Sequence, residues 1–130
     1  MAENIPGIYR IIVPVAAPER AFEFYSRLLG VEGRSVGGGR YYFDCGAVIL
    51  ALLKSTAEPN AEYIYFSVAD LEAVFARAKE LDCLSKGEVH GAAAGEIIVR
   101  PWGERCFYAY DPFGNGLCFV DERTLFTGKR

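Results

Sequence analysis

The sequence predicts an α+β protein built from two consecutive β-α-β-β-β modules. Three observations indicate this class: an internal repeat that superposes Val15 on Val68, a change from strand-like to helical apolar spacing in both copies, and a strand-turn-strand stretch near the end of the chain. No segment between the copies is long or polar enough to separate two domains. We therefore expect a single domain over residues 1–130, with modules at about 7–55 and 61–122.

The first module begins with an extended run at residues 9–15 and continues into a helix. Pro18 suits the first helical turn, and Gly30 suits the position just after the last one. Aromatic and branched residues then fill 40–44 and 47–53 on either side of a short Cys-Gly turn. This pattern predicts a β-hairpin after the helix.

The second module repeats the order of strand and helix. Residues 63–68 form the extended run, and Asp70 is a typical N-cap for the helix that follows. The stretch 84–95, rich in Gly and Ala, is expected to be a loop. Three further strands are predicted, the last two joined by the turn DPFGNG: 96–101, 104–110 and 117–121.

Composition excludes several classes of function. The chain has 130 residues and a formal net charge of -3, which gives no reason to expect nucleic acid or an anionic membrane as a partner. No apolar run approaches the ~20 residues of a membrane-spanning helix, and the N-terminus lacks the pattern of a secretory signal. The four cysteines are widely spaced, which favours reduced thiols. We therefore expect a cytoplasmic protein.

Three motifs carry a resemblance to a known family. They are ERAFEFYSRLLG in the first helix, FSVADLEAV where the second helix begins, and PWGERCFYAYDPFGNG near the end. In this order they resemble the vicinal oxygen chelate superfamily, which includes glyoxalases, extradiol dioxygenases and bleomycin resistance proteins, and most of all its bleomycin-resistance-like branch. The resemblance implies a mixed sheet curled around a cleft, with the helices outside, and a homodimer.

Family enzymes bind a divalent metal through His, Gln or Glu on the first and last strands of the modules. The matching positions here are Arg10, Leu50, Tyr63 and Cys118. A guanidinium has no lone pair to give and leucine offers no ligand atom, so these residues do not make a metal site. We expect neither a metal nor a cofactor.

Two further candidates for chemistry have simpler explanations. The single histidine, His90, lies in the uncertain 84–95 segment and is expected to be an exposed loop residue. Cys106 and Cys118 could become reactive if Arg105 or Arg10 lowered a thiol pKa. Buried, inert cysteines are the favoured interpretation.

Alternation along the strands predicts which side chains line the cleft. Pairing Tyr110 with Leu117 places Ala109 opposite Cys118, with Arg105 and Phe107 on the same face. The predicted ligand-binding set is mostly aromatic and apolar, with two cations: Arg10, Tyr41, Phe43, Leu50, Tyr63, Tyr65, Trp102, Arg105, Phe107 and Cys118. Aromatic faces supply buried area and a guanidinium fixes orientation, which suits a small aromatic or amphipathic molecule.

These residues leave three functional hypotheses. The leading one is metal-free binding of a small organic molecule, as in sequestration or resistance. The alternative is a glyoxalase- or dioxygenase-like enzyme, a lyase, isomerase or oxidoreductase, that uses Arg10, Tyr63 or Arg105 as electrostatic or acid-base groups. The third is a structural or interaction module whose aromatic residues fill their own core.

Overall fold

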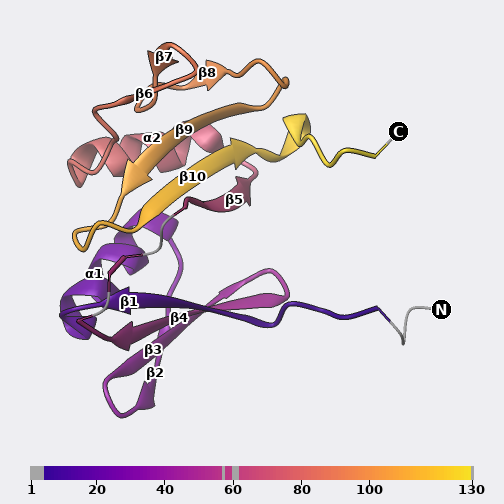
Figure 1. Cartoon of the computed structure of the whole chain (residues 1–130). Coiled ribbons are helices and arrows are strands. Elements are labelled where there is room, and N and C mark those ends of the chain that lie inside the picture. The colour runs from indigo at the N-terminus through magenta and orange to yellow at the C-terminus, as the bar shows by residue number, and fades with distance from the viewer. Residues whose placement is uncertain (1–4, 57, 60–61, 130) are drawn as a thin grey trace.

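The structure, a computed structural model, describes residues 5–56, 58–59 and 62–129. The first repeat contains one helix and four strands in the order β-α-β-β-β (Figure 1). Its elements are β1 (Arg10–Val15), α1 (Pro18–Leu29), β2 (Arg34–Gly37), β3 (Arg40–Cys45) and β4 (Val48–Lys54).

The second repeat has the same order with a longer excursion after its helix. This excursion contains a two-stranded hairpin within the segment predicted as a loop, and β8 is shorter than the predicted strand. The elements are β5 (Ile64–Val68), α2 (Leu71–Glu80), β6 (Glu88–Val89), β7 (Ala92–Ala93), β8 (Ile98–Val99), β9 (Arg105–Tyr110), β10 (Gly116–Asp121) and a short 3₁₀ helix, Glu122–Thr124.

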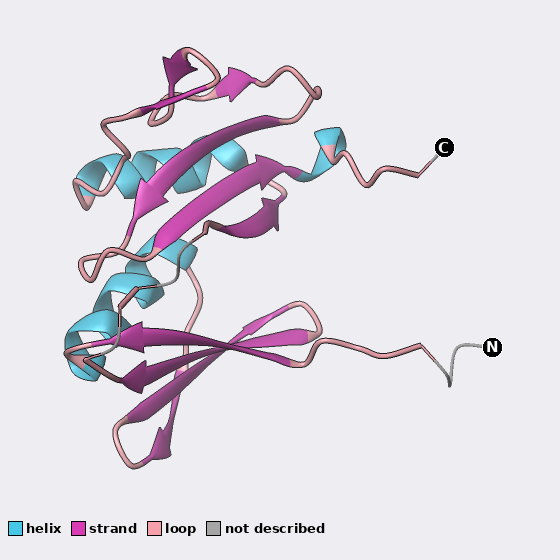
Figure 2. Cartoon of the chain, in the orientation of Figure 1, coloured by secondary structure: helices cyan, strands magenta, loops and turns pink. Residues whose placement is uncertain are grey.

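Each repeat builds its own four-stranded mixed sheet. The strand orders are β1-β4-β3-β2 and β5-β10-β9-β8, with β1 parallel to β4 and β5 parallel to β10. The predicted α+β class and duplicated topology are therefore confirmed, although no residues had been assigned to β2. No described strand of one sheet is hydrogen-bonded to a described strand of the other, so the expected curled sheet consists of two separate halves (Figure 2).

Both helices begin as the sequence predicts, and α1 also ends as predicted. Pro18 occupies the first helical turn of α1, and Gly30 ends it with a left-handed φ of 70°, a conformation that glycine adopts without a Cβ clash. Asp70 caps α2 by accepting a hydrogen bond from the backbone N–H of Ala73 at 3.1 Å. Between the helices, Arg77 of α2 donates from Nε to the carbonyl oxygen of Leu28 at 3.0 Å.

The main hydrophobic core joins the two repeats. It contains fully buried residues from α1 and its sheet, such as Val13 and Leu28, together with Leu71 of α2 and Phe119 of β10. A second, smaller cluster lies on the other face of the second sheet and is described below. The two repeats therefore share one core, and the single domain stays a prediction.

The DPFGN turn fastens the second repeat to the first. The buried carboxylate of Asp111 accepts hydrogen bonds from the Tyr25 hydroxyl of α1 at 2.7 Å and from the Asn115 side-chain amide at 2.8 Å. The same amide donates to the carbonyl oxygen of Pro14 in β1 at 3.0 Å. This motif therefore has a structural role that explains its Asp and its Asn.

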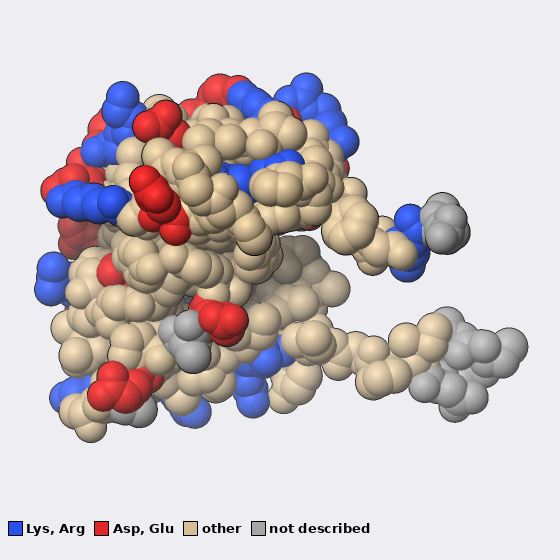
Figure 3. Space-filling model, turned by 45° about the horizontal axis from the view of Figure 1, so that its top comes forward, with Lys and Arg blue, Asp and Glu red and all other residues tan. Residues whose placement is uncertain are grey.

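The surface between the repeats carries few charges. In Figure 3 the Lys, Arg, Asp and Glu side chains lie mostly around the periphery, while largely uncharged residues line the hollow between the two halves. Over the described residues, no helix has the length and apolar character needed to cross a membrane.

Candidate binding site

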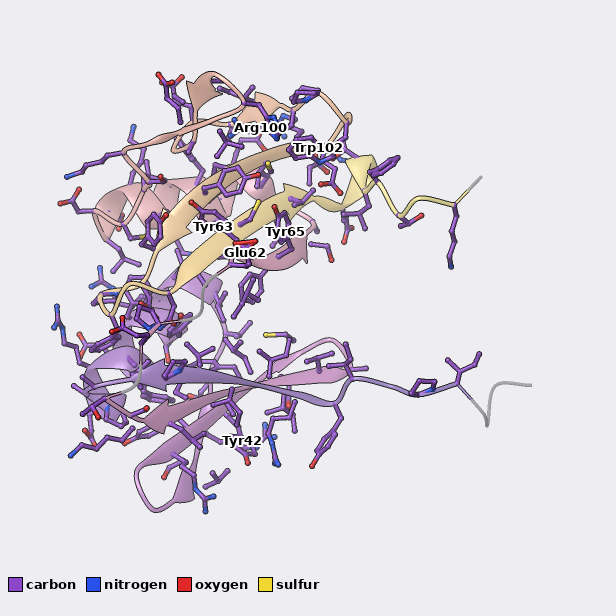
Figure 4. The ribbon with its side chains drawn as sticks, viewed as in Figure 1. Tyr42, Glu62, Tyr63, Tyr65, Arg100 and Trp102 are labelled. Atoms are coloured by element: carbon purple, nitrogen blue, oxygen red, sulfur yellow. The ribbon has the colours of Figure 1, made fainter. Side chains whose placement is uncertain are left out.

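The tyrosine face is a cluster of four tyrosines on the side of the second sheet that is turned away from α2. It consists of Tyr63, Tyr65, Tyr108 and Tyr110. The Tyr63 ring lies 4.7 Å from that of Tyr108, and the Tyr63 and Tyr110 hydroxyls are 2.7 Å apart. Figure 4 shows Tyr63 and Tyr65 side by side in front of β10. Edge-on and tilted rings of this kind form a rigid aromatic surface.

Tyr63 holds its proton at neutral pH. Burial and the hydrogen bond shared with Tyr110 raise the pKa of Tyr63 to about 12. A phenol in this state donates a hydrogen bond readily but is a poor general base, since an efficient catalytic base has a pKa near the working pH. The tyrosine face is therefore better suited to contacting a ligand than to moving its protons.

Alternation places Arg10 on the face of the first sheet away from α1, as predicted. Its neighbours Ile11 and Val13 belong to the core beneath α1, whereas Arg10 itself is exposed and donates from Nη1 to the Tyr42 hydroxyl at 2.9 Å. The Arg10 guanidinium also lies 5.8 Å from the centre of the Tyr42 ring. Figure 4 shows Tyr42 on the first repeat, well apart from Tyr63 and Tyr65.

The four positions that bear metal ligands in family enzymes do not fit a metal ion here. The repeat superposes Ile12 on Tyr65. Ile12 pairs with Ala51 and Tyr65 pairs with Cys118, so Ala51, not Leu50, is the counterpart of Cys118. With Ala51 instead of Leu50 as the fourth position, the matched residues still offer only one thiol and one phenol as ligand groups. Moreover, no group of three His, Cys, Asp or Glu in the described residues could hold a metal.

A cavity of about 460 Å³ lies between the two repeats. Its volume falls in the range of small-molecule pockets. Tyr65 belongs to its wall and also touches Tyr108, with ring centres 6.4 Å apart, so the cavity adjoins the tyrosine face. Most of the wall is apolar, and the full lining is Ile11, Leu29, Val31, Asp44, Cys45, Gly46, Val48, Leu50, Ile64, Tyr65, Phe66, Ser67 and Val68.

The prediction that Arg105 and Phe107 share the face of Cys118 is wrong. Tyr108, not Ala109, pairs with Cys118, and this one-residue difference moves the odd-numbered side chains of β9 to the helix side. Phe107 is fully buried there, with its ring 5.2 Å from that of Phe75 in α2. Arg105 forms ion pairs with Glu72 of α2 and Asp121 of β10.

The first hairpin also turns its predicted cleft residues toward a helix. Phe43 pairs with Leu50, and both are buried in the core beneath α1. Tyr41 stacks on Phe22 of α1 at 4.6 Å. These three side chains therefore do not form an open aromatic wall, although Leu50 still contributes to the cavity lining. The physical reason is that α1 needs an apolar surface to cover, and this face supplies it.

Trp102 and His90 pack against each other. Their rings meet edge to face at 5.1 Å, and the indole Nε1 of Trp102 donates to Glu104 at 2.7 Å. His90 is exposed in the turn between β6 and β7, as expected from the sequence. Whether any residue of the predicted set contacts a ligand stays a prediction.

Arg100 is only 3% exposed and was not among the predicted site residues. Its guanidinium lies 5.1 Å above the Tyr108 ring, and its Nε lies 3.4 Å from the sulfur of Cys106. Figure 4 shows it above Tyr63 and Tyr65, beside β9. The signal in the sequence is weak, because Arg100 ends a short apolar run in a segment with no clear periodicity.

Comparison with known proteins places the chain in a family. Residues 7–119 match the Glyoxalase/Bleomycin resistance protein/Dioxygenase superfamily, and the chain belongs to this superfamily. The predicted family is thereby confirmed. None of the curated proteins is significantly similar to the chain in sequence.

Solved structures of the same fold include two oxidases and a lyase. Oxidase ChaP-H1 is 20% identical with a TM-score of 0.75, over 90% of this chain and 96% of that one. Oxidase ChaP-H2 is 23% identical with a TM-score of 0.74, over 89% and 93%. Lactoylglutathione lyase from Agrobacterium tumefaciens is 20% identical with a TM-score of 0.65, over 91% and 95%. At these identities the likeness shows the fold alone.

Proposed function

We propose that the protein binds a small aromatic or amphipathic organic molecule in the cavity between the repeats, without a metal ion. The observation that carries the proposal is the largely apolar cavity of about 460 Å³, with Tyr65 at its border with the tyrosine face. Apolar walls bury a ligand and a few polar groups orient it. Here the hydroxyls of Tyr65 and Ser67 and the carboxylate of Asp44 are the polar groups of the lining.

The side chains of the cavity lining narrow the class of ligand that the cavity can bind. Arg10 is not part of the lining, and the carboxylate of Asp44 is paired with Arg34 at 2.8 Å. The lining therefore offers no free cation to a ligand anion. An uncharged aromatic molecule that carries a hydroxyl, amine or carbonyl group fits this surface best.

An enzymatic role has less support from the geometry. Arg105 is held by two carboxylates on the helix side, and Tyr63 has a pKa too high for a base at neutral pH. The solved structures named as oxidases and a lyase are less than 25% identical to the chain. At this identity they do not assign a catalytic residue or a reaction to this site.

The proposal extends to a cytoplasmic homodimer. All four cysteines are free thiols, which is the usual state in a reducing compartment. Large apolar side chains near both ends of the described chain are exposed, among them Ile8 at 69% and Phe126 at 63%, and a second copy could cover them. Light scattering during size-exclusion chromatography tests this part, and a monomer at micromolar concentration contradicts it.

A pair of tryptophan substitutions tests the site. Val31 lines the cavity, whereas Val99 of β8 is exposed and lies outside it, so Val31→Trp obstructs the cavity and Val99→Trp is a matched control. A panel of aromatic compounds is screened by thermal shift in the presence of EDTA. We expect at least one compound to stabilise the wild type and Val99→Trp but not Val31→Trp. Equal stabilisation of all three proteins, or binding only after a divalent metal is added, contradicts the proposal.

A further inference from the structure

The charge of Arg100 is buried without a carboxylate partner among the described residues. The ion pairs among the described residues are formed by Arg34, Arg105 and Arg123. Arg100 instead donates to backbone carbonyl oxygens and to one sulfur. Its Nη2 lies 3.3 Å from the oxygen of Ala94 and 3.2 Å from that of Glu96. Carbonyl groups solvate a buried cation, but they do not neutralise it.

The group able to neutralise Arg100 is the thiol of Cys106. The Nε atom of Arg100 points at the Cys106 sulfur from 3.4 Å, and both residues are buried. Cys118 is the second thiol of the same cluster and lies diagonally across from Cys106 on β10, two residues before Val120, the residue that pairs with Cys106. Two thiols and a guanidinium thus meet on one dry face of the sheet.

The titratable groups around the two thiols all favour one thiolate there. The neighbouring Cys118 thiol and the Arg100 guanidinium lower the pKa of Cys106 despite its burial. The pKa of Cys118 is raised correspondingly, because it holds the proton that the pair shares. The other neighbours of the cluster are the phenol of Tyr63 and the apolar side chains of Ala94, Val89 and Val120.

We propose that Cys106 is a thiolate paired with Arg100, and that it is the site at which this protein reacts with soft carbon electrophiles such as alkyl halides. In the reaction the Cys106 sulfur forms a bond to the electrophilic carbon, and the carbon–halogen bond breaks. The halide leaves with the bonding electron pair. No proton is transferred, because the nucleophile is already ionised, and Cys118 keeps its proton.

Access to the thiolate requires the segment between α2 and β9 to open. This segment is held across the sheet by short contacts, such as the bond from the Tyr108 N–H to the Ala94 oxygen at 2.8 Å. Arg100 itself connects this segment to the sheet, since it contacts Ala93 of β7 and Cys106 of β9. Because β6 and β7 have two residues each, local opening costs less than global unfolding.

The first test measures the thiolate directly, without any need for access. Thiolates have an ultraviolet absorbance band that thiols lack, and this band is followed as pH rises. At about pH 6.5 an ordinary cysteine of pKa ~8.5 is roughly 1% ionised, so the four cysteines of the unfolded chain give a few hundredths of a thiolate. We expect about one thiolate per folded chain under the same conditions.

Variants assign the band to its residue. We expect Cys106→Ser to abolish it, Arg100→Met to move its midpoint to higher pH, and Cys45→Ser to leave it unchanged. If Arg100→Met does not fold, Cys118→Ala provides the same information, because loss of the neighbouring thiol also raises the midpoint. A folded wild type without the band at about pH 6.5, or a band that persists in Cys106→Ser, overturns the proposal.

The second test locates the reaction. Iodoacetamide is added at about pH 6.5 and the labelled cysteine is identified by peptide mass mapping. We expect the first label on Cys106, although Cys45 is more exposed. A first label on Cys45 overturns the proposal. Val31→Trp obstructs the cavity and is expected to leave the labelling of Cys106 unchanged. The reactive thiolate and the proposed ligand site are therefore tested independently.

Discussion

Removing the Tyr25 hydroxyl is expected to loosen the attachment between the two repeats. The hydroxyl of Tyr25 donates to the buried Asp111 carboxylate at 2.7 Å. A hydrogen bond to a charged group contributes about 1.5–3 kcal/mol. In Tyr25→Phe the carboxylate keeps its donors from the Phe113 and Asn115 N–H groups and the Asn115 side chain, so it is not left unsatisfied. We therefore expect the lower end of the range, a loss of about 1.5–2 kcal/mol.

Urea denaturation measures this loss as a change in the free energy of unfolding. The control is Tyr9→Phe, since Tyr9 is 63% exposed and its hydroxyl is in water. Asp111→Ala removes the acceptor itself and is expected to cost more than Tyr25→Phe, because four donors, the Tyr25 hydroxyl included, then lose this acceptor. A loss in Tyr25→Phe below about 0.5 kcal/mol, or one equal to that of the control, refutes the role assigned to the turn.

Three other predictions concern single sites. Gly116→Ala places a Cβ 2.6 Å from the Tyr63 ring, so this variant is expected to lose about 1–3 kcal/mol of stability. Urea denaturation measures the loss, and an unchanged midpoint contradicts this close packing. The hydrogen bonds from Arg123 lower the pKa of Asp121, so this residue stabilises the fold above its ordinary pKa of about 4 and less as pH falls. The stability difference between wild type and Asp121→Asn is therefore expected to shrink from pH ~5 downward, and a constant difference contradicts it. Burial raises the pKa of Cys83 to about 11, so at pH ~8 it is expected to stay unlabelled by iodoacetamide, and rapid labelling argues against its burial.

The repeat, the helix ends and the closing turn could be predicted because each depends on local chemistry. Pro18, Gly30 and Asp70 act within a few residues of themselves, and the structure places all three as expected. The face of β9 was not predictable in this way. Its register depends on the Asp111 N–H, which bonds to the Asn115 carbonyl oxygen and makes Tyr110 pair with Gly116 instead of Leu117. One residue of error exchanges the two faces of a strand.

The candidate site was only partly predictable, for a related reason. Alternation separates the two faces of the first hairpin but does not say which face the helix covers. The aromatic face with Tyr41 and Phe43 lies under α1, while Arg10 and Tyr42 lie on the other side. Arg100 was beyond local reasoning altogether, because it reaches Cys106 through the fold of an irregular segment.

We propose that the cavity between the repeats holds a small organic molecule without a metal ion. The most direct measurement is a native mass spectrum of the protein purified from its own host, combined with elemental analysis of the same sample. We predict a bound organic molecule that is retained by the Val99→Trp protein, lost from the Val31→Trp protein and present without stoichiometric metal. A tightly bound divalent metal at one per chain, or a ligand that both variants retain, rules out metal-free binding in this cavity.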